Sequence, residues 1–335
     1  MIHESSNSPT RQLSYRDRGV VVVGGLGYIG SNLTAALLAA CARVTIVTPD
    51  RTRHAALAAD FAHQGAYILD ADVRHAVRMR DAVRDADVVF NLSGQSGAIQ
   101  SVLNAAADLD VNCAGNLALL DAMRSDSPRA KIVFASSRLV YGAPRALPVV
   151  EDHPIAPLCP HGAHKAMVEQ YLAIYGRLFG LRSTTLRITN PYGPGQPAER
   201  SAYGVINFLI SRALAEQALP IYGDGAQLRD YVFIGDVVDA LLVSGLDDRS
   251  DGRVYNVASG AGTAMIDAAR QIVDAVGAGR IEHQQWPPLV HEIDTGDFVA
   301  DIGRIDRELG WRPTVAFADG LRRMVAAAAG QDARP

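Results

Sequence analysis

The chain has 335 residues, of which 48% are hydrophobic and 20% charged, and its net charge is −4. This length allows one large domain or two closely packed ones, and this charge gives no reason to expect nucleic acid or a membrane surface as a partner. No segment approaches the ~20 consecutive apolar residues that a membrane span requires. Residues 1–18 are polar and lack an apolar run, so we expect a disordered tail and no signal peptide.

Three cysteines, Cys41, Cys113 and Cys159, are far apart in the sequence and odd in number. They predict free thiols in a reducing compartment, and hence a cytoplasmic location. The histidines lack the spacing and the neighbouring carboxylates of a metal site, so no metal is predicted.

Short apolar runs alternate with helical stretches from residue 19 to residue 189. The first run, 20-VVVV-23, is followed by glycines and by 31-SNLTAALLAACA-42 at helical spacing. Further apolar runs lie at 43–47, 67–69, 87–92 and 131–136. Continuous apolar strands separated by helices indicate a parallel sheet covered on both faces. Right-handed crossovers then predict a Rossmann-type, doubly wound α/β domain over residues 19–189.

The pattern changes after residue 189, where 190-NPYGPGQPAERSAYG-204 is rich in proline and glycine and predicts a long loop. Helices are expected at 205–218, 263–276 and 315–329. Residues 190–335 are therefore predicted to form mainly a smaller α/β substrate-binding domain, with 228–262 packing back onto the first domain. No low-complexity linker separates the two halves, so we expect them to pack tightly.

Gly24, Gly27 and Gly30 have the spacing G-x-x-G-x-x-G between a predicted strand and a predicted helix. Gly24 suits a tight turn, Gly27 a close approach of a pyrophosphate, and Gly30 close packing of helix on strand. The start of the helix then offers N–H groups to the phosphates. A dinucleotide site is expected here, and a tight turn without a ligand is the alternative.

The residue that ends the second strand of such a fold normally selects the cofactor. An acidic side chain there binds the ribose hydroxyls of NAD, whereas NADP needs a small residue and a nearby arginine. Thr48 holds that position, and Asp50 and Arg51 follow. This pattern slightly favours NADP over NAD. The alternative is that Asp50 and Arg51 merely begin a solvated loop.

Several ordered motifs along the chain resemble those of one family. They are 24-GGLGYIG-30, 72-DVR-74, 91-NLSGQS-96, 111-VNCAGNLALLDA-122, 134-FASSRLVYG-142, 186-LRITNPYGPG-195, 222-YGDGAQLRDYVFIGDVVDA-240, 254-VYNVASG-260 and 308-ELGWRP-313. From about residue 19 to 325 the chain resembles the extended short-chain dehydrogenase/reductases, and among them the NAD-dependent epimerase/dehydratase group. The resemblance implies a tightly bound NAD or NADP and a nucleotide-sugar substrate.

The same resemblance implies a homodimer formed by helices at 101–124 and 162–179. The second of these segments offers an apolar face consisting of Val168, Tyr171, Leu172 and Tyr175.

The resemblance also assigns roles to matched positions. It implies cofactor contacts at Tyr28 and Ile29 (pyrophosphate), Asp72 and Val73 (adenine), Leu92, Ser93 and Gly94 (ribose and nicotinamide), Asn112 and Lys165. It implies substrate contacts at Gln95, Ser137, Arg138, Asn190, Asn207 and Arg229. Structural alternatives stay open, since Asp72 could cap a helix, Asn112 could be a buried packing amide, and Arg229 could pair with Asp230.

The step that this family shares is hydride transfer between a sugar carbon and the nicotinamide, and a base must take the hydroxyl proton. In the family a tyrosine is the base, next to a lysine, and a serine hydrogen-bonds the reacting oxygen. This chain has Ser137 and Lys165 but places His161 where the tyrosine stands. A neutral imidazole can accept a proton, although Lys165 and an oxidised nicotinamide would both disfavour the imidazolium. We therefore expect an epimerase that uses His161 as its acid/base and passes through a transient keto sugar.

Other interpretations stay open at this point. Another group, such as His164 or Tyr141, could be the base; the enzyme could be a one-way sugar ketoreductase or dehydrogenase; or the chain could bind a dinucleotide without catalysis.

Two departures from the family's motifs concern the substrate. Arg138 and Leu139 stand where sugar 4,6-dehydratases carry an Asp-Glu pair, so dehydration by that route is not expected. Arg138 is then either a contact for a carboxylate or phosphate, or a surface cation. The stretch 287–301 offers only His291 where the family adds a second arginine for the diphosphate. Either Arg229 holds the diphosphate alone, or the substrate is not a standard nucleotide sugar.

Overall fold

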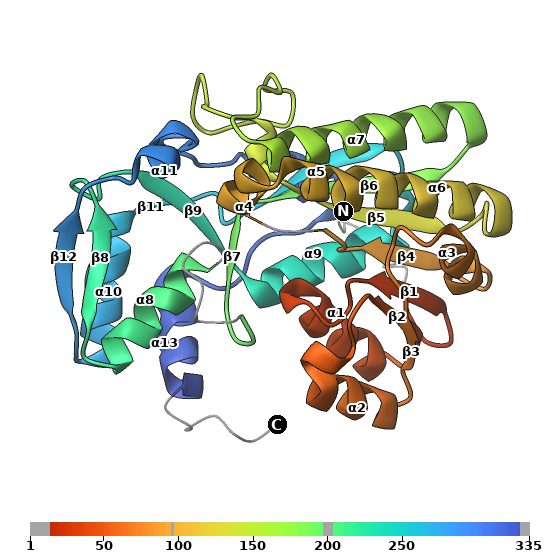
Figure 1. The fold of residues 1–335 in the computed structure, drawn as a ribbon, viewed down its shortest axis with the longest axis horizontal. Helices are drawn as coiled ribbons and strands as arrows, with labels where there is room; N and C mark the ends of the chain where they lie inside the picture. The colour runs from red at the N-terminus through yellow and green to blue at the C-terminus, as the bar shows by residue number, and fades with distance from the viewer. Residues whose placement is uncertain (1–13, 95–96, 197–203, 329–335) are drawn as a thin grey trace, which may run out of the picture.

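A computed structural model describes residues 14–94, 97–196 and 204–328 of the protein. Its larger part is built on a seven-stranded parallel sheet (Figure 1). In sheet order the strands are β10 (Arg253–Val257), β6 (Arg182–Ile188), β5 (Lys131–Ser137), β4 (Val88–Asn91), β1 (Gly19–Val23), β2 (Arg43–Thr48) and β3 (Tyr67–Asp70). The chain runs outward from β1 to β3 and then returns to β4 on the other side of β1. The predicted Rossmann-type, doubly wound α/β class is confirmed.

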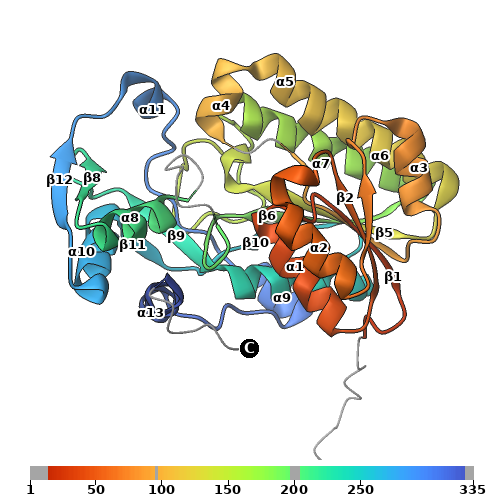
Figure 2. The same ribbon diagram turned by 60° about the horizontal axis from the view of Figure 1, so that its bottom comes forward.

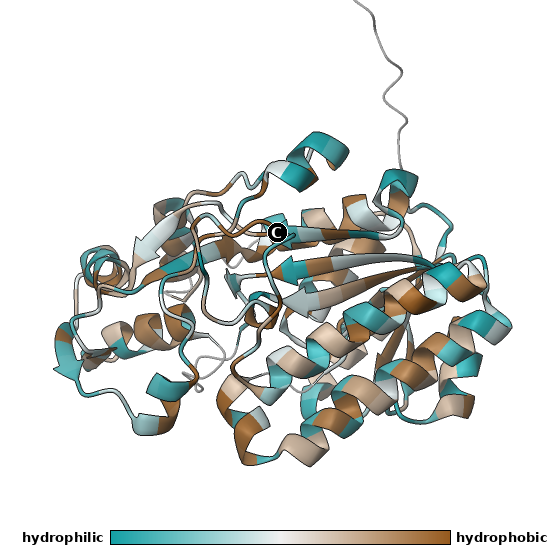
Figure 3. Ribbon diagram, turned by 90° about the horizontal axis from the view of Figure 1, so that it is seen from above, coloured by the Kyte–Doolittle hydropathy of each residue, from teal (hydrophilic) through white to brown (hydrophobic). Residues whose placement is uncertain are grey.

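Helices cover both faces of this sheet (Figure 1). One face carries α3 (Ala76–Val83), α6 (Gly115–Asp126) and α7 (Pro160–Phe179), and the other carries α1 (Tyr28–Ala39), α2 (Ala55–His63) and α9 (Ile234–Leu246). The strands are continuous apolar runs because both of their faces are covered; every residue of β1 is buried. The covering helices show alternating hydrophobic and hydrophilic bands (Figure 3), as expected for helices with one buried face and one exposed face.

The remaining part of the molecule lies beyond the carboxyl end of β6. It contains a three-stranded sheet of order β11-β9-β7 and a two-stranded pair, β12-β8. These strands are β7 (Asn190–Tyr192), β8 (Ala218–Tyr222), β9 (Leu228–Phe233), β11 (Gly262–Ala264) and β12 (Arg280–Gln284). Its helices are α8 (Val205–Leu214), α10 (Met265–Val276), α11 (Pro288–Glu292) and α13 (Phe317–Ala328), whereas α12 (Gly303–Leu309) packs against β10 of the large sheet. Figure 2 shows α8 and α10 beside β8 and β12, apart from the large sheet. No helix in the described ranges is both long and apolar enough to cross a membrane.

A chain of short helices joins β4 to α6. It consists of α4 (Ala98–Leu103), α5 (Ala105–Leu109) and one π-helical turn, η2 (Asp110–Ala114). Single π-helical turns inside helices frequently occur at functional sites. The 3₁₀ turns are η1 (Thr52–His54), η3 (Arg138–Val140) and η4 (Asp248–Ser250).

The prediction that residues 1–18 form a disordered tail is wrong for its last part. Residues 1–13 lie outside the described residues, but Tyr15 is only 4% exposed. Its ring packs against Phe90 of β4, and its hydroxyl donates a hydrogen bond to the carbonyl of Leu242 at 2.8 Å. The segment around Tyr15 therefore packs against both β4 and α9, the helix that covers this strand.

Two of the four residues expected on an apolar dimer face lie elsewhere. Val168 and Leu172 are buried beneath α7, in the core between this helix and the sheet. They cannot contact a second subunit, because the protein's own core covers them. Ile174 and Leu178 are apolar residues that α7 leaves exposed. The homodimer stays a prediction.

A buried ion pair ties α7 to β6. Glu169 accepts hydrogen bonds from the guanidinium of Arg187, with 2.6 Å between Oε2 and Nη2, and both side chains are at most 5% exposed. Removing one partner of a buried pair costs roughly 3–5 kcal/mol, because the other charge stays buried and unpaired.

We predict that Glu169→Gln lowers the free energy of unfolding by about 3 kcal/mol, as measured by urea denaturation. Glu282→Gln, on the exposed strand β12, is the matched control and should leave it unchanged. Equal stability of the two variants would contradict a structural role for the pair.

Candidate active site

The turn between β1 and α1 presents concave backbone at the carboxyl edge of the sheet. Gly24 has a φ of +83°, and a Cβ there would lie 2.9 Å from the carbonyl oxygen of Leu92. A Cβ on Gly30 would lie 2.1 Å from the carbonyl oxygen of Gly24, so the helix packs directly on the turn. Gly27 precedes α1 and no side chain caps it, which leaves the first N–H groups of the helix, from Tyr28 and Ile29 onward, available to an anion. This backbone fits the pyrophosphate of a dinucleotide.

Thr48 and Asp50, expected near the adenosine ribose, lie at and just after the end of β2. Thr48 is buried, and Asp50 is exposed. The Asp50 carboxylate accepts hydrogen bonds from the hydroxyl of Thr52 and the backbone N–H groups of Thr52 and Arg53. These bonds, the Thr52 hydroxyl first, hold the pKa of Asp50 below its usual value. Asp50 therefore holds the start of η1 in place and Arg51 is exposed, while the contacts of both residues with the cofactor stay predictions.

Asp72 and Val73, expected near the adenine, follow β3. The carboxylate of Asp72 forms an ion pair with Arg74, with 2.7 Å between Oδ2 and Nη2. Hydrogen bonding to Arg74 lowers the pKa of Asp72. Val73 is buried and lies against Gly115, where a Cβ would come within 2.4 Å of its Cγ1. Both residues therefore have local structural roles in addition to the predicted contact.

Three segments converge at Gly94, after β4. A Cβ on Gly94 would lie 2.3 Å from Oδ1 of Asn112 and 3.4 Å from Nζ of Lys165. Leu92 is half-buried, and Ser93 is buried with its hydroxyl 2.6 Å from Oδ1 of Asn91. Gln95 lies outside the described residues. The loop after β4, the π-helical turn and α7 thus meet where the nicotinamide end is expected.

Helix α7 begins against the segment that follows Ser137. A Cβ on Gly162 would lie 2.4 Å from the carbonyl oxygen of Leu139, so only glycine fits between them. The neighbouring His161 is 6% exposed, and its backbone N–H donates to Oγ of Ser101 at 3.1 Å. Ser137 is half-buried at the end of β5.

Lys165 lies one helical turn after His161. Its ammonium donates to the carbonyl of Ala135 at 3.0 Å and sits 4.7 Å from the centre of the Phe134 ring. Burial lowers its pKa to about 8, against the opposing effect of nearby Asp108. The structure therefore brings Ser137, His161 and Lys165 to one edge of the sheet.

Asp108, which sequence reasoning missed, lies beside His161 and His164 and near Lys165. Its carboxylate is fully buried, with Oδ1 2.6 Å from Nδ1 of His164 and Oδ2 3.8 Å from Nδ1 of His161. Burial would raise its pKa, but hydrogen bonding to the two histidines and Asn112 and the charge of His161 outweigh burial, so the pKa lies below its usual value. One signal was available, because Asp108 precedes Asn112 by four residues and so shares its helical face.

Tyr141, an alternative base, is unsuited to that role. Its ring is fully buried, and its hydroxyl donates to Oδ1 of Asn256 at 2.6 Å. Burial raises its pKa to about 12, so the phenol holds its proton at neutral pH.

Arg138 is half-buried, and neighbouring groups hold its guanidinium, unlike a free surface cation. Its Nε donates to Oδ1 of Asn190 at 3.3 Å, its Nη1 donates to Oγ1 of Thr295 at 2.6 Å, and its guanidinium lies over the ring of Phe298. Burial, and after it the nearby charge of Arg229, lower its pKa to about 10.

Arg229 does not pair with Asp230, the alternative raised by the sequence. Its guanidinium pairs with Asp294 and donates to the carbonyl of Gly296 at 2.8 Å. Asp230 instead accepts hydrogen bonds from backbone N–H groups, including that of Ala300 at 3.1 Å. Two arginines far apart in the sequence, Arg138 and Arg229, are thus brought close together.

Asn190 and Asn207, both expected to contact the substrate, form hydrogen bonds that hold neighbouring loops in place. Nδ2 of Asn190 donates to the carbonyl of Asp230 at 2.8 Å, which places Oδ1 against Arg138. Nδ2 of Asn207 donates to the carbonyl of Gly193 at 3.1 Å. Oδ1 of Asn207 is buried and accepts no hydrogen bond from the part of the chain that the structure describes.

Comparison with known proteins identifies the family. The model of the NAD dependent epimerase/dehydratase family matches residues 20–258. The chain belongs to this family. A UDP-glucose 4-epimerase of Mycolicibacterium smegmatis is 33% identical over 311 residues, which cover 91% of this chain and 96% of that protein. Two solved structures are similar over the whole fold: a UDP-glucose 4-epimerase of Thermus thermophilus with NAD (30% identity, TM-score 0.83, 93% and 99% covered) and a UDP-N-acetylglucosamine 4-epimerase of Methanobrevibacter ruminantium (28% identity, TM-score 0.87, 94% and 99% covered).

Family membership makes the protein an enzyme of the extended short-chain dehydrogenase/reductase type. The family description names NAD, and the Thermus structure holds NAD. The slight preference for NADP drawn from Thr48 and Arg51 has no support in these comparisons.

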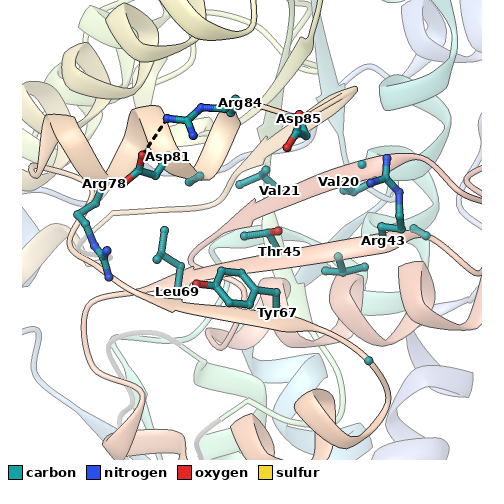
Figure 4. A pocket seen from close by; sticks show the side chains of 16 residues that line it. Val20, Val21, Arg43, Thr45, Tyr67, Leu69, Arg78, Asp81, Arg84 and Asp85 are labelled. Atoms are coloured by element: carbon teal, nitrogen blue, oxygen red, sulfur yellow. Dashed lines mark hydrogen bonds and ion pairs between the residues drawn. The ribbon is translucent and has the colours of Figure 1, made fainter.

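A separate hollow of about 610 Å³ lies at the amino ends of β1, β2 and β3, opposite the glycine turn (Figure 4). Arg43, Tyr67, Arg78 and Asp81 are among its walls, and no predicted site residue lines it. The candidate site of this epimerase/dehydratase family member is at the other edge. Within the described ranges, no three His, Cys, Asp or Glu side chains are grouped to hold a metal ion.

The buried Lys165 makes the stability of the cofactor-free protein depend on pH. Its pKa is about 8 in the folded protein against an ordinary value of 10.5, so the unfolded chain binds more protons between these values and stability rises with pH. We predict that Lys165→Met is more stable than the parent at neutral pH, and that this advantage shrinks as the pH rises from 8 to 10.5. Urea denaturation across this range tests it; a constant difference would contradict the low pKa.

Proposed function

We propose that this protein is an NAD-dependent epimerase of a nucleotide sugar, which acts through a transient keto sugar with His161 as the acid/base. The observation that carries the proposal is the buried imidazole of His161 at the start of α7, beside the segment that follows Ser137 and one turn before Lys165. The similar proteins named as 4-epimerases of UDP-sugars support the substrate class.

NAD, when bound, would accept a hydride from the sugar carbon and return it. The uncapped start of α1 after Gly27 would hold its pyrophosphate, and Asn112 and Lys165 would flank its nicotinamide end beside Gly94. A side chain at Gly94 would collide with Asn112, so glycine keeps this approach open.

Two side chains of the protein, Ser137 and His161, would transfer the proton of the sugar hydroxyl. Ser137 would hydrogen-bond the reacting sugar hydroxyl, and the neutral imidazole of His161 would take its proton as the carbon loses its hydride. The imidazolium keeps that proton while the planar keto carbon presents its other face. His161 then returns the proton when the hydride comes back, so neither protons nor electrons are gained or lost overall.

Arg138 and Arg229 would bind the anionic part of the substrate. The two guanidiniums lie close enough for the charge of Arg229 to lower the pKa of Arg138, and Asp294 pairs with Arg229. An anion placed between two guanidiniums relieves their repulsion and gains charge-assisted hydrogen bonds. Arg138 thereby supplies the second arginine that the stretch 287–301 lacks.

The first test is the reaction itself. UDP-glucose, UDP-N-acetylglucosamine and dTDP-glucose are each incubated with the protein, and NMR of the products reports the configuration of the sugar carbons. We expect the parent to interconvert epimers of at least one of them. His161→Phe should lower turnover about 100-fold or more, since it removes general-base catalysis, and His161→Tyr should be more active than His161→Phe.

Unchanged turnover in His161→Phe would contradict the role of the histidine. Net accumulation of reduced nicotinamide with the parent would instead identify a one-way dehydrogenase.

The second test concerns the anion. Arg138→Met should raise KM about 10-fold or more while kcat changes less, because charge-assisted hydrogen bonds to a substrate anion are lost. Arg270→Met, on the exposed face of α10, is the matched control. A KM for Arg138→Met equal to that of the control would show that Arg138 does not bind the substrate.

A further inference from the structure

We propose that Asp108 is a positioning residue that orients the imidazole of His161 and stabilises its imidazolium form, with His164 as a second donor to the same carboxylate. The proposal rests on the proposed role of His161 as the acid/base. It identifies the group that allows His161 to accept a proton although the positive charge of Lys165 lies close by.

The geometry places one carboxylate between two imidazoles. Nδ1 of His164 lies 2.6 Å from Oδ1 of Asp108, a hydrogen-bond distance at which the histidine must donate. Nδ1 of His161 lies 3.8 Å from the other oxygen, Oδ2. His164 thus fixes the carboxylate on one side, and its second oxygen is directed toward His161.

This arrangement determines which nitrogen of His161 reacts. A carboxylate beside Nδ1 favours the tautomer that carries its proton there, which leaves Nε2 as the proton acceptor. When Nε2 takes the sugar hydroxyl proton, one O–H bond breaks and one N–H bond forms. Nδ1 keeps its own proton and Asp108 stays ionised, as in other pairs of histidine and aspartate.

The charges around the site explain why a carboxylate is needed. The ammonium of Lys165 and an oxidised nicotinamide both oppose a positive charge on His161. Asp108 is the opposing negative charge, and it lies near Lys165 as well as His161. With 3.8 Å between Nδ1 of His161 and Oδ2 of Asp108, the attraction between the two groups increases when the imidazolium forms. An interaction that strengthens with developing charge lowers the barrier.

The surrounding elements bury the carboxylate of Asp108, and its pKa lies below the usual value, so it is ionised. The titratable side chains that face it are His161, His164 and Lys165 from α7, Cys159 just before α7, and Cys113 from η2. Asn112, also in η2, hydrogen-bonds it. Asp108 is fully buried, so water does not screen its charge.

The first measurement does not depend on activity. The ring signals of His161 are followed by NMR against pH in the intact, cofactor-loaded protein and in Asp108→Asn, with His161→Phe to assign them. The titration midpoint of His161 should fall by about one pH unit or more in Asp108→Asn, because a charge that favours the imidazolium is removed. Asp110→Asn, two residues away and exposed, should leave the midpoint unchanged. An unchanged midpoint in Asp108→Asn would overturn the proposal.

The second measurement separates positioning from a structural role. In the parent, Asp108→Asn should lower kcat about 100-fold, with KM within about 3-fold. In the His161→Tyr background the same substitution should leave kcat unchanged or raise it, because a carboxylate beside a phenol opposes the phenolate. Equal losses in both backgrounds would overturn the proposal. A parent that is inactive on every nucleotide sugar would refute the proposed function, whereas the NMR titration would still decide the pairing of Asp108 with His161.

Discussion

The parallel arrangement of the large sheet is the constraint on which the site depends. Because all its strands run in the same direction, the segments after β1, β2, β3, β4 and β5 emerge at one edge. Gly24 and Ser137 therefore lie at the same edge of the sheet, although more than a hundred positions separate them in the sequence. Helix α7 then begins against the turn after Ser137 and brings His161 and Lys165 to it.

The site contains several buried or half-buried charged side chains, and burying charge costs folding stability. Burial of Lys165 costs stability, as its low pKa records, and its ammonium contacts the carbonyl of Ala135 and the ring of Phe134. Asp108 supplies a negative charge within the same group, and Arg138 and Arg229 place two positive charges together nearby. Such an arrangement weakens folding, and proteins typically carry it where a substrate or cofactor interacts with those charges.

Local patterns in the sequence predicted the fold class and the glycine turn, whereas most other candidate site residues were implied by the resemblance to the family. Apolar runs of strand length and the spacing of Gly24, Gly27 and Gly30 are local signals, and the structure places a strand, a tight turn and a helix there. Contacts between distant segments could not be predicted. Arg229 pairs with Asp294, 65 residues away, and Asp108 meets His164 across 56 residues.

Periodicity showed that Val168 and Leu172 share an apolar face, but it could not show that the core of the same subunit covers them. Tyr15 was assigned to a polar tail because its partner, Leu242, is far along the chain.

The central claim is that an imidazole, and not a phenol, takes the proton when the sugar is oxidised. The most direct measurement is the single-turnover rate of nicotinamide reduction, after the NAD-loaded protein is mixed with a nucleotide sugar that it epimerises, as a function of pH. The parent's rate should rise with pH through one ionisation, and in His161→Tyr the inflection should move to higher pH, because a phenol holds its proton more strongly than an imidazolium. The same pH profile in both proteins would contradict the account.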